Sequence, residues 1–301
     1  MFKHCLVVGG TSGIGEALAV DLGQRFPQAA IVIAGRNREK AQRICDAAKH
    51  KNLQYAPLDA SLMKNVKAFC ARYPQDATLP TSPIDLLIMS QGIFTTQGRT
   101  EVDPAHEKVD QKMALHYYSR MCLVKDLLAH KKLSENATIV SVLDGLRSDA
   151  NAKSMLFDDL DLVHNYSLAK AAEHCLNMTD VLFDHWARMD EHKQRTFIHA
   201  YPGFVATELL TNSPHMSFGL GPILSTISKW VATSPSKCAS LLLAGSGKEE
   251  PKGILASQMP DHPNRYNLDA SGRPVKKTPI KSANHEKLIV EHTWSILDRG
   301  Q

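Results

Sequence analysis

Hydrophobic and polar residues along the chain follow two alternating spacings. Short apolar runs, bounded by polar or glycine-rich segments, predict buried strands at residues 5–8, 30–34, 54–58, 86–89, 138–142 and 196–200. Between these runs, apolar residues recur three and four positions apart, which predicts helices at residues 15–26, 37–49, 61–73, 105–129 and 164–189. Strands that alternate with helices favour an α/β fold, in which a doubly wound parallel sheet lies between two layers of helices.

The remaining segments are expected to belong to the same domain. The 301 residues contain no internal repeat, and we expect a single domain over residues 1–301. Residues 206–234 are expected to form a small helical lid. Residues 246–301 are expected to form a C-terminal extension, with a last strand at residues 253–258.

Composition narrows the class of protein. With 43% hydrophobic and 22% charged residues the chain is an ordinary globular protein, and its mild net charge of +4 predicts no nucleic-acid partner. No apolar run approaches the ~20 residues of a membrane span, and the 14 histidines show no metal-ligand spacing, so we expect neither a membrane partner nor a metal site. Six separated cysteines without a C-x-x-C pair, and a first strand that leaves no room for a cleavable signal, predict a reduced, cytoplasmic protein.

A glycine-rich segment joins the first predicted strand to the first predicted helix. Gly9, Gly13 and Gly15 follow the apolar run in the spacing G-x-x-x-G-x-G. A strand, a tight turn and a helix N-terminus in this order can bind a pyrophosphate. The spacing differs from the G-x-G-x-x-G of the general dinucleotide motif, and a glycine-rich turn without a ligand is the alternative.

Tyr166 and Lys170 stand four positions apart in a predicted helix. Residues at this spacing share one helix face, so the ammonium group can lie beside the phenol. A nearby cation favours the ionised phenol and lowers its pKa, which makes Tyr166 a candidate general acid/base. Taken alone, the two residues could also be an ordinary pair on a helix surface.

Together, the glycine-rich loop, the Tyr166-x-x-x-Lys170 spacing and the later pair Pro202-Gly203 resemble the short-chain dehydrogenase/reductase family. The resemblance runs over residues 3–245. Segments such as L-H-Y-Y-S-R at residues 115–120 look most like fungal members, some of them from metabolite pathways. The resemblance implies a Rossmann fold and a nicotinamide cofactor.

The resemblance also implies a cofactor site and favours NADP(H). Where an NAD-specific member has an acidic residue after the second strand, this chain has Arg36, whose guanidinium group suits the 2′-phosphate of NADP. Asp59 matches the family residue that contacts adenine, and Gly92 is retained from the family's Asn-Ala-Gly segment. The expected cofactor-binding residues are Gly9, Thr11, Ser12, Gly13, Ile14, Gly15, Arg36, Asp59, Ser90, Gln91, Gly92, Tyr166, Lys170, Pro202, Gly203, Val205 and Thr207.

In the family, tyrosine, lysine, serine and asparagine side chains act together on a carbonyl or alcohol group. Tyr166 and Lys170 match the first two, as the acid/base and as the ribose-binding residue that tunes its pKa. The register of the fifth strand places Asp144 at the serine position, although Ser154 stands at a familiar distance before the tyrosine. The frame of the fourth helix places His116 at the asparagine position.

The two replacements each leave two interpretations open. Asp144 donates a hydrogen bond only when burial raises its pKa, and a loop-capping aspartate is equally expected. His116 could relay protons because imidazole titrates near neutral pH, and a ring that only packs the helix is equally expected.

These residues lead to two functional hypotheses. The first is an NADP(H)-dependent oxidoreductase that reduces a carbonyl, or oxidises an alcohol, of a small organic substrate such as a secondary metabolite. The second is a protein of the same fold without ordinary redox chemistry: a cyclase or isomerase that uses Tyr166 and Asp144, or a cofactor-binding protein without turnover. The retained pair of Tyr166 and Lys170 favours the first hypothesis.

The family resemblance also predicts the assembly state. Family members usually pair through their fourth and fifth helices, and residues 105–129 and 164–189 are long and apolar enough for this contact. We therefore expect a homodimer. Arg120 and Lys125 could instead make the first of these helices face solvent.

Overall fold

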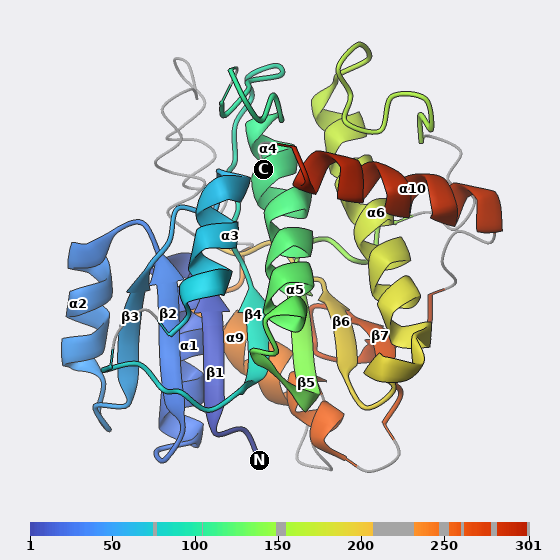
Figure 1. Ribbon diagram of the computed structural model, residues 1–301. Helices are drawn as coiled ribbons and strands as arrows, with labels where there is room; N and C mark the ends of the chain where they lie inside the picture. Colours follow the sequence, from blue (N-terminus) through green and yellow to red (C-terminus); the bar gives the residue numbers. More distant parts are fainter. Residues whose placement is uncertain are drawn as a thin grey trace.

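One mostly parallel sheet defines the fold (Figure 1). The computed structural model describes residues 1–74, 77–103, 105–148, 155–206, 232–246, 253–259, 262–277 and 282–299. Eight strands in these residues form one sheet in the order β3-β2-β1-β4-β5-β6-β7-β8, with only β8 antiparallel to its neighbour. The strands are β1 (His4–Val8), β2 (Ala30–Gly35), β3 (Leu53–Pro57), β4 (Ile84–Met89), β5 (Leu133–Val142), β6 (Thr196–Ala200), β7 (Arg265–Leu268) and β8 (Pro274–Val275).

Helices cover both faces of this sheet, which confirms the predicted α/β/α architecture (Figure 1). Buried residues of α3, α5 and α6 form one core with the sheet, and those of α1, α2 and α9 form the other. The helices are α1 (Gly13–Arg25), α2 (Arg38–Ala47), α3 (Met63–Arg72), α4 (Gln111–Met113), α5 (Ser119–Ala129), α6 (Leu168–Arg188), α9 (Pro235–Ala244) and α10 (Ala283–Leu297). A π-helical turn, η1 (Ala114–Tyr118), joins α4 to α5, and two 3₁₀ turns are η2 (Asp190–His192) and η3 (Gly253–Gln258).

The first strand shows why the strand predictions succeed. Leu6 and Val8 belong to the core beneath α3, α5 and α6, whereas Cys5 and Val7 belong to the core beneath α1 and α9. Successive side chains of a strand point to opposite faces, so a strand covered on both faces is an unbroken apolar run. Each of the first six predicted strands overlaps an observed one.

The last predicted strand, at residues 253–258, is wrong. These residues form the 3₁₀ turn η3, in which the Ser257 hydroxyl donates to the Ile254 carbonyl at 2.8 Å. The seventh strand is instead β7. An apolar run of this length has the same pattern in a strand and in a short helical segment. Most of the predicted lid, residues 207–231, lies outside the described residues.

The predicted helix at residues 105–129 begins six residues later than expected. Asp110 is its N-cap, because its Oδ1 atom accepts from the backbone N–H groups of Lys112 at 3.0 Å and Met113 at 3.2 Å. The helix then passes through η1 before α5. A side-chain acceptor at this position satisfies donors that the helix itself leaves open, which fixes the start.

The predicted helix at residues 164–189 also begins late. Ser167 is its N-cap and accepts from the backbone N–H of Lys170 at 3.2 Å. Tyr166 therefore precedes α6, and the predicted shared helix face of Tyr166 and Lys170 is wrong. The position of Tyr166 depends on the loop before α6.

The C-terminal helix α10 lies across the outer side of α5 and α6 (Figure 1). It is joined to η1 by a hydrogen bond of 2.6 Å between the hydroxyl groups of Tyr117 and Thr293. Lys125 of α5 binds Asp298 at 2.7 Å. Arg120, by contrast, is 1% exposed and points into the protein, so the alternative of a solvent-facing Arg120 is wrong. No helix in the described ranges combines the length and apolar character of a membrane span.

Candidate active site

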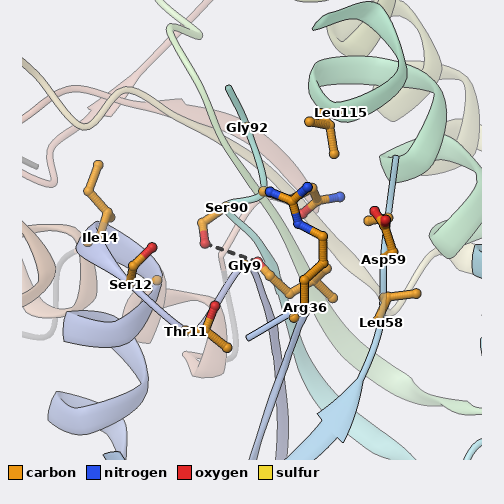
Figure 2. A pocket seen from close by; sticks show the side chains of 16 residues that line it. Gly9, Thr11, Ser12, Ile14, Arg36, Leu58, Asp59, Ser90, Gly92 and Leu115 are labelled. Atoms are coloured by element: carbon orange, nitrogen blue, oxygen red, sulfur yellow. Dashed lines mark hydrogen bonds between the residues drawn. The ribbon is translucent and has the colours of Figure 1, made fainter. Parts of the chain in front are cut away.

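A cavity opens at the carboxyl ends of β1, β2, β3 and β4, where parallel α/β sheets commonly bind ligands (Figure 2). Most of its wall comes from the loops that follow these strands and from the start of α1. The cavity brings together 11 of the residues that the sequence predicts to bind the cofactor: Gly9, Thr11, Ser12, Gly13, Ile14, Gly15, Arg36, Asp59, Ser90, Gln91 and Gly92.

Gly9 lets two strand ends approach each other at the floor of this cavity. Its φ angle is +81°, and a Cβ atom there would lie 2.6 Å from the backbone nitrogen of Gln91. A side chain is therefore excluded both by conformation and by space. Nearby, the Ser90 hydroxyl donates to the Val8 carbonyl at 3.0 Å and ties the same two loops together.

The start of α1 presents a site for a negative group. Ser12 is the N-cap residue of α1, but its side chain makes no capping hydrogen bond. The first turn of a helix carries backbone N–H groups and the positive end of the helix dipole. Because these groups border the cavity, they can bind a phosphate.

Arg36 and Asp59 stand at the far side of the cavity, after β2 and β3 (Figure 2). Arg36 is exposed and brings a positive charge to the rim. The Asp59 carboxylate accepts from the backbone N–H of Ser61 at 3.0 Å and from its hydroxyl at 2.7 Å. This local turn fixes the carboxylate at the cavity wall.

Tyr166 lies beside the start of α4 and does not line the cavity. Its hydroxyl donates to Asp110 Oδ1 at 3.4 Å, and the ammonium group of Lys112 lies 5.1 Å from the centre of its ring. Burial, followed by the negative charge of Asp110, raises the pKa of Tyr166. The predicted lowering of this pKa is therefore wrong, and the phenol keeps its proton at neutral pH.

The sequence did not point to Asp110, although it is fully buried and contacts the candidate acid. Besides capping α4, it accepts from the backbone N–H of Thr100 at 3.0 Å through its second oxygen. An aspartate directly before a helix is a recognisable N-cap. The expectation of an unbroken helix over residues 105–129 hid this signal.

His116 is part of the π-helical turn η1. Its Nε2 atom accepts from the backbone N–H of Ile93 at 3.2 Å, and its ring lies against Gly92 in the cavity wall. Burial first, and then the charges of Arg120 and Lys112, lower the pKa of His116 to about 3. The imidazole is therefore neutral at physiological pH and accepts, rather than donates, at Nε2. Turns of this kind are frequent at functional sites.

Asp144 lies in the loop after β5, half-buried and paired with exposed Arg147 at 3.4 Å. Burial raises its pKa, against the opposing charge of Arg147. A raised pKa favours the protonated form that a hydrogen-bond donor needs. Gly145, the residue after Asp144, is held in place because the Asn267 side chain donates to its carbonyl at 2.7 Å.

The other predicted site residues that the structure describes lie outside the cavity wall. Lys170 lies in the first turn of α6, and Pro202, Gly203 and Val205 follow β6 at the same edge of the sheet, but none of these four lines the cavity. Gly203 has a φ angle of +74°. The predicted residues Ser154 and Thr207 lie outside the described residues.

Comparisons with known proteins point to one family. The sequence profile of the short chain dehydrogenase family matches residues 3–217. The chain is 34% identical over 212 residues to oxidoreductase AN1596 of Emericella nidulans, covering 69% of this chain and 60% of that protein. It is 30% identical over 246 residues to oxidoreductase andH of Emericella variicolor, covering 80% of this chain and 66% of that protein. The matches span less than two thirds of the length of these two relatives.

Solved structures show the same fold at low identity. A short-chain dehydrogenase/reductase from Burkholderia multivorans with bound NADP superimposes with a TM-score of 0.57 at 18% identity, covering 92% of this chain and 100% of that one. A second short chain dehydrogenase/reductase family protein gives a TM-score of 0.55 at 18% identity, with 90% and 97% coverage.

Proposed function

This chain belongs to the short-chain dehydrogenase family, and from this premise we propose that it is an NADP(H)-dependent oxidoreductase. It reduces a carbonyl group, or oxidises an alcohol, of a small organic substrate. The observation that carries the proposal is one cavity that gathers 11 of the 17 predicted cofactor-binding residues, with Arg36 at its rim. The relatives are fungal oxidoreductases, and a secondary metabolite is proposed as the substrate from the resemblance of this chain to fungal members of the family.

The residues around the cavity fit a dinucleotide. Gly9 lets the loops after β1 and β4 approach each other beside the cavity, and the first turn of α1 can hold the pyrophosphate. Arg36 can pair with a 2′-phosphate through charge-assisted hydrogen bonds. When bound, the nicotinamide ring would supply a hydride to a carbonyl group or accept one from an alcohol.

Tyr166 holds the proton for the reaction. Its raised pKa keeps the phenol protonated at neutral pH, and an alkoxide oxygen is a stronger base than the tyrosinate that remains. The hydrogen bond from Tyr166 to Asp110 is long at 3.4 Å, so a substrate oxygen can replace Asp110 as its acceptor. Neutral His116 keeps the backbone at Ile93 in place beside the cavity.

A non-redox reaction is the second candidate, and the environment of Asp144 favours it. Its raised pKa suits a group that exchanges protons, and the register of the fifth strand predicts it at the position where the family has a serine. The replacement Asp144→Ser distinguishes the two candidates. In a reductase it keeps or raises activity, whereas in an acid–base isomerase it abolishes product formation, and the unmodified protein forms product without consuming NADPH.

Replacement of Tyr166 by phenylalanine tests the proposal. Tyr166→Phe should abolish NADPH consumption with a panel of small ketones and aldehydes, while the affinity for NADPH barely changes. Tyr118→Phe is the matched control, because its hydroxyl binds His292 at 2.9 Å beneath α10 and not the site. Absorbance of the reduced nicotinamide and product formation are followed together. Full activity in Tyr166→Phe would contradict the proposed acid.

The proposal includes the surroundings in which the protein works. All six cysteines are free thiols, which supports a reducing, cytoplasmic location. The proposed partner is a small-molecule substrate, and the homodimer remains a prediction that light scattering at micromolar concentration can check.

A further inference from the structure

Arg120 is a buried cation directly behind the candidate active site. It is the second residue of α5, it follows the π-helical turn that carries His116, and its side chain is 1% exposed. Burial lowers its pKa to about 9, which still leaves the guanidinium group charged at neutral pH. Burial of the guanidinium charge destabilises the folded protein unless the N–H groups of the guanidinium find hydrogen-bond acceptors.

The guanidinium group joins three segments of the chain. From its Nη2 atom it donates to the Gln91 carbonyl at 2.7 Å, in the wall of the cavity. Its Nη1 atom donates to the Ser141 hydroxyl at 2.7 Å and to the Val142 carbonyl at 3.0 Å, at the end of β5. Its Nε atom donates to the Leu115 carbonyl at 3.3 Å, within the π-helical turn.

Each of these acceptors is close in sequence to a residue of the candidate site. Gln91 is two residues before Ile93, whose N–H group binds His116. Val142 is two residues before Asp144, and Leu115 directly precedes His116. All four acceptors are uncharged oxygens, so the group acts here by its geometry: a planar fork with donors in fixed directions.

We propose that Arg120 is a positioning residue for this active site, which fixes the loop after β4, the end of β5 and the π-helical turn relative to one another. The expected effect on cofactor binding rests on the proposed function. The structural part of the inference does not: the hydrogen bond between Ile93 and His116, and the position of Gln91 in the cavity wall, depend on the Arg120 side chain, which contacts neither the ligand nor a reacting atom.

The test replaces Arg120 by methionine, which retains much of the apolar stem and removes every donor. We expect the dissociation constant for NADPH, measured by fluorescence titration, to rise about fivefold, because the Gln91 wall loses a hydrogen bond. In ¹⁵N spectra of histidine-labelled protein, His116 of the wild type should carry its proton on Nδ1, because Nε2 accepts from Ile93. In Arg120→Met the ring should populate both tautomers and titrate at a higher pH. The variant His116→Asn identifies the resonance.

Arg195→Met is the matched control. Arg195 also donates to two backbone carbonyls, that of Ser134 at 3.1 Å, at the opposite end of β5, and that of Glu191 in η2 at 2.9 Å. It should alter thermal stability without changing NADPH affinity or the His116 spectrum. Should Arg120→Met fail to fold, Ser141→Ala removes one acceptor of the same guanidinium group and should shift the His116 spectrum in the same direction.

The outcomes separate the two proposals. If Arg120→Met, or Ser141→Ala in its place, leaves the His116 spectrum as in the wild type, the inference is overturned. If the wild type binds neither NADPH nor NADH, the proposed function fails, while the His116 spectrum still decides the role of Arg120. A change of the His116 spectrum that Arg195→Met reproduces would also overturn the inference, because it would reflect general loosening.

Discussion

Arg36 gives the most direct test of the cofactor. The replacement Arg36→Asp reverses the charge at the rim of the cavity. A hydrogen bond to a charged group contributes about 1.5–3 kcal/mol, and about 1.4 kcal/mol corresponds to a factor of ten in affinity. NADPH should therefore bind about 10- to 150-fold more weakly. Because Arg36 is exposed, solvent screens the pair and the lower end of this range is expected.

The two cofactors should respond in opposite directions. NADH lacks the 2′-phosphate, and an aspartate at this position can accept a hydrogen bond from its ribose hydroxyl, so its affinity should stay equal or improve. Fluorescence titrations with both cofactors measure the change. They are repeated at two salt concentrations, since screening should reduce the preference of the wild type for NADPH.

Arg43→Asp is the control for this experiment. Arg43 is an exposed arginine on α2, the helix that follows Arg36, and it does not line the cavity. The control should leave both affinities close to those of the wild type. The reasoning would be refuted by a wild-type preference for NADH, or by an equal loss of NADPH affinity in the two variants.

Two further predictions concern buried charges. Asp180 is 4% exposed and accepts from His199 and Arg265, each at 2.7 Å, so Asp180→Asn should lower the free energy of unfolding by about 3–5 kcal/mol in chemical denaturation. Burial raises the pKa of Asp180, but the charges of His199 and Arg265 outweigh this effect and lower the pKa overall. The ionised carboxylate therefore stabilises the folded protein at pH values above about 3.9, the pKa of an aspartate in the unfolded chain. As the pH falls below that value, the difference in the free energy of unfolding between the wild type and Asp180→Asn should shrink. Asp110→Asn keeps the one oxygen atom needed to cap α4 and removes the charge beside Tyr166, so it should lower the pKa of Tyr166. Ultraviolet titration of tyrosinate, compared with Asp110→Asn/Tyr166→Phe, measures this pKa, and an unchanged value would show that burial alone sets it.

The sequence predicts the sheet and the dinucleotide end of the site because both are local. An apolar run covered on both faces reveals each strand, and Gly9 is required by a turn that the sequence places correctly between β1 and α1. The residues of the loop between β1 and α1 line the cavity. The order of strands and turns in the sequence is enough to predict this position.

The other end of the site depends on contacts between distant segments, which periodicity does not encode. The spacing of Tyr166 and Lys170 predicts one helix face, but the N-cap at Ser167 starts α6 after the tyrosine. The pKa of Tyr166 then depends on Asp110, which is 56 residues away in the chain. Arg120 has a polar side chain on an apolar helix, and only its acceptors on β5 and after β4 explain its burial.

The same kind of contact restricts the predicted homodimer. The family resemblance predicts that the homodimer pairs through residues 105–129 and 164–189, but α10 lies against η1 and α6, which belong to these two segments. Glu286 of α10 binds Arg188 of α6 at 2.6 Å, and Trp294 packs on Trp186 with ring centres 6.0 Å apart. A partner subunit would have to displace these contacts or pair beside α10. Any homodimer that keeps α10 in place must therefore use other surfaces of α5 and α6 than the ones that this helix covers.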